Sequence, residues 1–96
     1  MHENRRLILA KKVMEELDEY IAQRNRAFEN DDLDWAREKL KRDTCDEVVT
    51  MAFHKARLHC TAITDTARIR SRDWLAEREL TDGYGQPITK DTPLPE

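Results

Sequence analysis

Residues 44–80 read TCDEVVTMAFHKARLHCTAITDTARIRSRDWLAEREL, and this stretch predicts a helical protein. Its start matches a capping box, because Thr44 is followed three positions later by Glu47 and then by an apolar run. The threonines around Asp65 weaken the middle of the stretch, so a separate final helix over 66–80 is an alternative to one long helix. Apolar and small residues recur at helical spacing: Val49, Ala52, Phe53, Ala56, Cys60, Ile63 and Ala67.

The first half of the chain predicts two more helices. Residues 4–29 carry an apolar stripe at three- and four-residue steps. The polar run Asn30, Asp31 and Asp32 ends this helix, and either aspartate is a good N-cap for the next. The first stripe consists of Leu7, Ala10, Met14, Leu17, Ile21 and Phe28, and the second helix carries Leu33, Ala36 and Leu40 beside Trp35.

The strong helix breakers are confined to the end of the chain. Both glycines and all three prolines of the chain lie between Gly83 and Pro95. We therefore expect an α-helical domain over 1–81 and an extended or flexible C-terminal tail over 82–96. The predicted fold is all-α, either a helical hairpin or a three-helix bundle, and the tail could add to a partner's groove or clasp its own bundle.

Composition excludes several classes of protein. The chain has 96 residues, of which 39% are hydrophobic and 39% charged, with a net charge of −3. No apolar run approaches the ~18 residues of a membrane span, and the first residues do not resemble a signal peptide. The two cysteines, Cys45 and Cys60, form no Cys-x-x-Cys pair, which favours a reducing, cytoplasmic setting.

Charge and helix length both predict a partner. Residues 15–34 carry a charge of −6 and residues 51–72 a charge of +4. One helix over 44–80 would be about 55 Å long, against about 39 Å for residues 4–29. The part of the longer helix that extends beyond the shorter one would leave an apolar stripe uncovered, so we expect a homodimer or docking on another protein.

One acidic constellation could bind metal. Glu15, Glu16 and Glu19 lie one turn apart, and Asp43 and Asp46 follow before an apolar helix. The arrangement resembles the E-E-x-x-E … E-x-x-D pattern of MazG-like all-α nucleotide pyrophosphohydrolases, although Asp43 stands where that pattern has glutamate. The resemblance implies Mg²⁺ bound by Glu15, Glu16, Glu19 and Asp46, and cleavage of a nucleoside triphosphate to a monophosphate and pyrophosphate. The alternative is a solvated acidic face on an amphipathic helix.

A basic stripe offers a second alternative. Arg57, Arg68 and Arg72 are eleven and four residues apart, so they would share one face of a straight helix and could contact phosphates. Pairing with the acidic first helix inside the bundle is the other interpretation. His54 and His59 are five residues apart and cannot chelate one metal together, so Cys60 is expected to be a core thiol and His59 a boundary residue.

The leading functional hypothesis is a non-enzymatic protein-interaction module without cofactor, acting as an adaptor or inhibitor of a larger complex. Small, charged, glycine-poor chains of this kind are common among phage and mobile-element proteins. The Mg²⁺-dependent pyrophosphohydrolase and a nucleic-acid contact are the alternatives, and no membrane partner is expected. The predicted interaction residues are Glu15, Glu16, Glu19, Asp31, Asp32, Trp35 and Trp74.

Overall fold

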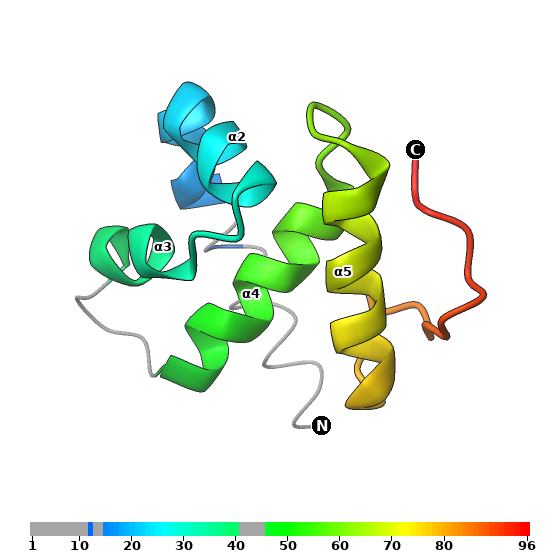
Figure 1. Ribbon diagram of the computed structural model, residues 1–96. Coiled ribbons are helices and arrows are strands. Elements are labelled where there is room, and N and C mark those ends of the chain that lie inside the picture. The colour runs from blue at the N-terminus through cyan, green and yellow to red at the C-terminus, as the bar shows by residue number, and fades with distance from the viewer. Residues whose placement is uncertain (1–11, 13–14, 41–45) are drawn as a thin grey trace.

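The computed structural model describes residues 12, 15–40 and 46–96. The described chain is all-α, as predicted, and holds no β-strand beyond a single bridge between Thr81 and Pro87. Within this part of the chain no helix is long and apolar enough to cross a membrane. The elements are the 3-10 turn η1 (Asp18–Tyr20) and the helices α2 (Ile21–Glu29), α3 (Leu33–Lys39), α4 (Asp46–His59) and α5 (Asp65–Glu77) (Figure 1).

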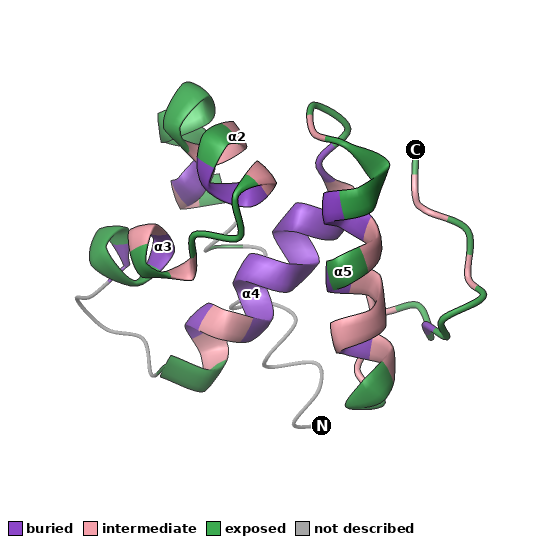
Figure 2. Cartoon of the chain, viewed as in Figure 1, coloured by how far each residue is buried: buried purple, intermediate pink, exposed green. Residues whose placement is uncertain are grey.

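Helix α4 is the central element of the fold. It runs between α2 and α3 on one side and α5 on the other (Figure 1). Its middle is buried around its whole circumference, as the unbroken purple stretch in Figure 2 shows. The sequence of this enclosed helix is neither uniformly hydrophobic nor amphipathic, because some of its buried residues are polar. The buried residues of α4 are Val49, Met51, Ala52, Phe53, His54, Lys55, Ala56, Arg57 and Leu58.

Two apolar clusters surround α4. The larger one joins α4 to α2 and α3, and at its centre the rings of Phe28 and Phe53 meet edge to face at 5.3 Å. The smaller one joins Leu58 of α4 to Leu75 of α5 and to Ile88, beyond the helices. Since burial of an apolar side chain contributes about 1.5–3 kcal/mol, these clusters supply most of the driving force for the fold.

The predicted helix over 4–29 is wrong as one continuous helix. Its first residues lie outside the described part, but the described part breaks at Tyr20, whose φ of −119° and ψ of 46° are not helical. The break turns Ile21 toward solvent, where it is 57% exposed, whereas Leu17 is fully buried. Tertiary contacts outweigh helix propensity here, because the Tyr20 ring packs against Trp35 of α3 at 6.2 Å.

The described part of this stretch, residues 46–80, forms two helices, so the alternative with a separate final helix is the correct one. Helix α4 ends at His59, and α5 begins at Asp65, capped by the Thr64 hydroxyl, which accepts from the Ala67 amide. The N-cap of α5 is therefore Thr64, while Thr44, the cap predicted at the start of the stretch, lies outside the described residues. The break removes the overhang of a 55 Å helix, so helix length gives no argument for a homodimer.

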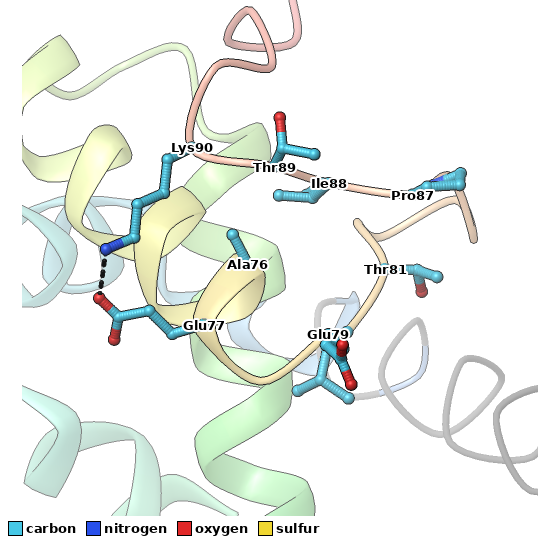
Figure 3. A pocket seen from close by; sticks show the side chains of 9 residues that line it. Ala76, Glu77, Glu79, Thr81, Pro87, Ile88, Thr89 and Lys90 are labelled. Carbon is cyan, nitrogen blue, oxygen red and sulfur yellow. Dashed lines mark ion pairs between the residues drawn. The ribbon is translucent and has the colours of Figure 1, made fainter.

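The C-terminal tail clasps its own bundle, the second of its two predicted roles. Residues 87–96 run along α5, with Ile88 buried in the smaller cluster and Leu94 packed against it (Figure 1). An ion pair of 2.9 Å joins Lys90 to Glu77 near the end of α5 (Figure 3). The tail therefore covers a face of α5 that would otherwise meet solvent.

Candidate functional site

The candidate site is a groove of about 700 Å³ in which the first turns of α4 meet the last turn of α5. We call it the Trp74 groove. Its apolar lining consists of Val48 and Met51 of α4, Trp74 of α5, and Leu80 beyond the end of α5. Charged groups from α3, α4 and α5 surround this lining. The groove is lined by Arg37, Asp46, Glu47, Val48, Thr50, Met51, Trp74, Arg78 and Leu80.

The ring of Trp74 is held in place by two neighbours. His54 of α4 stacks on it with ring centroids 4.1 Å apart and planes 17° apart. The Arg78 guanidinium lies 4.0 Å from its ring centre, and an Arg78 Nη1–H donates to the Trp74 carbonyl at 2.9 Å. A fixed aromatic ring binds a partner at low entropic cost, because its rotamer is already selected.

His54 supports this ring as a neutral imidazole. Burial, followed by the positive charge of Arg57, lowers the pKa of His54 from 6.5 to about 4. Its Nδ1 lies 3.0 Å from the Ser71 hydroxyl of α5, so the stack is also tied by a hydrogen bond. The support for Trp74 therefore does not change its charge near neutral pH.

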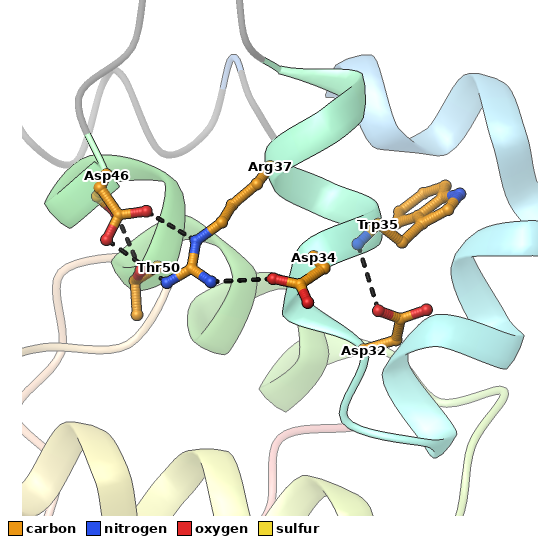
Figure 4. A network of polar contacts seen from close by, with 6 residues as sticks. All are labelled: Asp32, Asp34, Trp35, Arg37, Asp46 and Thr50. Atoms are coloured by element: carbon orange, nitrogen blue, oxygen red, sulfur yellow. Dashed lines mark hydrogen bonds and ion pairs between the residues drawn. The ribbon is translucent and has the colours of Figure 1, made fainter.

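An ion bridge closes the groove at its rim. Arg37 of α3 contacts both carboxylate oxygens of Asp46 at the start of α4, at 2.6 and 3.4 Å, and Asp34 at 3.0 Å (Figure 4). The hydrogen bonds that Arg37 donates, to Asp46 first and then to Asp34, raise the pKa of Arg37. The Thr50 hydroxyl donates to the Asp46 carbonyl at 2.8 Å. The bridge links α3 to α4 and leaves Glu47 exposed beside it.

Three of the predicted interaction residues are engaged within the chain. The Asp31 carboxylate accepts a hydrogen bond of 2.7 Å from Arg57, and the Asp32 carboxylate caps α3 by accepting from the Trp35 amide at 3.2 Å (Figure 4). The indole of Trp35 donates to the Gln23 side chain at 3.2 Å and packs against the larger cluster. Of the two tryptophans, Trp74 alone lines the large groove.

The four predicted metal ligands do not form a metal site. Glu15 and Glu19 are exposed, Glu16 is half-buried, and Asp46 is engaged by Arg37 on another helix. The turn η1 also interrupts the regular helical spacing between Glu16 and Glu19. Over residues 12, 15–40 and 46–96, no group of three or more histidine, cysteine, aspartate or glutamate side chains could hold a metal ion. Asp43, which stands at a glutamate position of the pattern, lies outside the described residues.

The basic stripe on one straight helix is wrong. Arg57 belongs to α4 and is fully buried, while Arg68 and Arg72 belong to α5. Arg68 donates to the Leu58 carbonyl at 2.9 Å and to the Pro95 carbonyl, and Arg72 donates to the Thr92 carbonyl at 3.2 Å. These arginines therefore bind the protein's own chain, because the helix break at 60–64 redirects them.

The cysteine and histidine at the end of α4 lie as expected, Cys60 in the core and His59 at its boundary. Cys60 is buried, and its thiol lies 3.6 Å from the Asn25 side-chain oxygen. His59 is half-buried, and its Nε2 accepts from the Gly83 amide at 2.8 Å. Burial is the largest cause that lowers the pKa of His59. Both side chains fasten the end of α4 to neighbouring segments.

Sequence reasoning found Trp74 and missed the residues around it. The spacing of Trp74 and Arg78, four apart on one helix, was a usable signal for a cation–π pair. Arg37 and Asp46 gave no such signal, because they lie on different helices and meet only in the folded chain. Comparisons of the chain with protein-family models, curated proteins and solved structures give no match.

Proposed function

We propose that this chain is a small α-helical protein-interaction module, an adaptor or inhibitor, that binds a segment of a larger protein in the Trp74 groove. The observation that carries the proposal is the half-buried, immobilised Trp74 in a groove of about 700 Å³ whose lining combines apolar and charged side chains. Tryptophan and arginine are the residues most enriched among interface hot spots, and here Trp74 and Arg78 stand together.

The dimensions of the groove favour a peptide segment as the bound element. Pockets of about 300–1,000 Å³ accept one or two large side chains. The groove is open along the ends of two antiparallel helices, a geometry that suits an amphipathic segment laid between them. We therefore propose that one apolar side chain of the partner inserts against Trp74 and Met51.

The charges at the rim favour a partner with a basic residue beside its apolar anchor. Asp34, Asp46 and Glu47 outnumber Arg37 and Arg78 around the groove. A positive group would meet the exposed Glu47 at the start of α4, where it would not face either arginine. Such rim charges accelerate association and select the partner more than they add affinity.

The proposal is tested by site-specific photo-crosslinking. The photoreactive residue p-benzoylphenylalanine replaces Glu47 at the groove or, as a control, Ala22 on the exposed side of α2. Adducts formed in an extract of the source cells are identified and mapped by mass spectrometry. We expect one partner segment, joined from position 47 and not from position 22, whose sequence holds an apolar residue next to a lysine or arginine.

A truncation supplies the matched test of affinity with the purified partner. Arg78→Ala removes the guanidinium that holds the Trp74 ring, whereas Arg26→Ala shortens an exposed arginine of α2 that does not line the Trp74 groove. We expect binding to weaken about tenfold or more for Arg78→Ala and to stay within about twofold for Arg26→Ala. Equal affinities, or adducts from both crosslinking positions alike, would contradict the proposal.

The described structure offers no observation that favours either alternative function. The carboxylates of the pyrophosphohydrolase resemblance are separated between the start of the chain and the rim of the groove. The arginines of the nucleic-acid hypothesis are buried or bound to the tail. These contacts therefore support binding of another protein better than they support catalysis or nucleic-acid binding.

A further inference from the structure

The outer face of α5 holds an extended peptide, and that peptide is the chain's own tail. Residues 87–96 lie along the helix, and the end of the tail runs on the side away from α4 (Figure 1). Within the tail, Thr89 and Thr92 close a small turn by bonding to each other, so this turn is held by its own atoms. Contacts to α5 occur on both sides of the turn.

The polar part of this recognition is directed at backbone atoms. Arg72 donates to the Thr92 carbonyl at 3.2 Å, and Arg68, one turn earlier on α5, donates to the Pro95 carbonyl. Guanidinium groups that bind carbonyl oxygens recognise an extended chain without regard to its side chains. The same two donors could therefore hold an extended segment of different sequence.

The apolar part of the recognition is incomplete. Ile88 is buried against Leu75, yet a cleft of about 590 Å³ remains between the tail and the last turn of α5. Ala76, Pro87 and Ile88 line it, and the Glu77–Lys90 ion pair lies at its edge (Figure 3). A side chain larger than isoleucine at this position would bury more apolar surface.

The tail is joined to the helices by a short connection that can act as a hinge. Gly85 adopts a φ of 84°, a left-handed conformation open to glycine at no steric cost. The Asp82 amide bonds to the Gln86 carbonyl, which closes the connection into a tight turn. Release of the tail requires the contacts beyond this turn to break, including the contact of Ile88 with the smaller apolar cluster.

We infer that the outer face of α5 is a binding surface for an extended peptide of another protein, one with an aromatic residue where the tail has Ile88, and that residues 87–96 cover it as an intramolecular competitor. A tethered segment acts at an effective concentration in the millimolar range. The surface is therefore closed to weak ligands and opens to a segment that fills the cleft better. This surface is separate from the Trp74 groove.

A chain with a released tail tests the inference directly. Ile88→Asp with Leu94→Asp removes both apolar contacts of the tail and leaves α5 unchanged. The probe is a fluorescently labelled synthetic peptide of residues 86–96, QPITKDTPLPE, and its binding is measured by fluorescence anisotropy. We expect it to bind the released chain at least about tenfold more tightly than the wild-type chain, where the tail competes.

Two comparisons identify the binding surface and its preference. Arg72→Ala in the released chain should weaken the peptide about threefold or more, whereas Arg70→Ala, an exposed arginine on the same helix, should not. A peptide carrying Ile88→Phe should bind at least about threefold more tightly than the original. Equal effects of the two arginine variants would overturn the assigned surface, and no gain from Ile88→Phe would overturn the aromatic preference.

Circular dichroism shows whether the released chain keeps its helices. If it does not, a measurement on the wild-type chain tests the inference instead. The Ile88→Phe peptide is added at millimolar concentration, and hydrogen exchange of the chain's own residues 86–96 is followed by mass spectrometry. We expect these residues to exchange faster as peptide is added, while α4 stays protected. Unchanged exchange of the tail would overturn the inference.

Discussion

The pair of Asp31 and Arg57 makes an asymmetric prediction about stability. Arg57 is fully buried in α4, and its Nη1–H donates a hydrogen bond of 2.7 Å to the carboxylate of Asp31, half-exposed in the α2–α3 connection. Among the described residues, the Arg57 Nε and Nη2 atoms are buried without a hydrogen-bond partner. Burial is the largest cause that lowers the pKa of Arg57. The pair therefore includes a poorly satisfied buried charge.

The change in the free energy of unfolding depends on which of the two partners is removed. Loss of one partner of a fully buried ion pair costs about 3–5 kcal/mol, and solvent screening of the half-exposed Asp31 reduces this to about 2 kcal/mol. Asparagine at this position keeps the side-chain shape and tolerates the φ of 57°. Asp31→Asn should therefore lower the free energy of unfolding by about 2 kcal/mol, a large part of the about 5–14 kcal/mol expected for such a domain.

Removal of the arginine should cost much less. Arg57→Met keeps the aliphatic stem, removes the buried charge and abolishes two unsatisfied donors, so we expect a change within about 1 kcal/mol. In the Arg57→Met background the cost of Asp31→Asn should nearly disappear. Urea unfolding followed by circular dichroism measures all four chains. Arg57→Met more destabilising than Asp31→Asn, or additive effects, would refute the reasoning.

Three further predictions concern single contacts. The neutral His54, with its pKa lowered from 6.5 to about 4, binds a proton in the unfolded chain before the native one, so stability should fall by about 3 kcal/mol as pH drops from 6.5 to 4. This slope in pH-dependent urea unfolding should be largely lost in His54→Gln. Thr64→Ala removes the cap of α5 and should lower the melting temperature by roughly 4–8 °C in calorimetry, with Thr64→Ser close to wild type. Arg37→Ala should destabilise the chain only slightly, and less still in 1 M salt, because the ion bridge is exposed and salt screens it. A loss of stability that does not depend on salt would show that Arg37 acts through packing.

The fold class could be predicted from local signals, and the helix boundaries only in part. The absence of glycine and proline before Gly83, with apolar residues at helical spacing, suffices for an all-α chain. The weak point at Thr61–Thr66 was visible, since threonine and aspartate compete with the helix backbone. The break at Tyr20 was not, because it depends on packing against Trp35, far along the sequence.

The candidate site was predictable only where its residues carry their own signature. Trp74 was identifiable as a large apolar surface near the end of a helix. The burial of Arg57 and the engagement of Arg68 and Arg72 by other segments could not be predicted from charge alone. An arginine at a given helical position looks the same in sequence whether it faces solvent, an aspartate or a carbonyl group.

The two tryptophans provide the most direct test of the Trp74 groove. Their indole N–H groups give two separate signals in a ¹H–¹⁵N correlation spectrum, and the Trp35 signal is an internal control, because Trp35 bonds to Gln23 away from the groove. The full chain is titrated with the partner segment recovered by crosslinking at position 47. We expect the Trp74 signal to shift or broaden with bound fraction while the Trp35 signal stays within its line width. A shift of Trp35 with Trp74 unmoved would show that the partner binds elsewhere.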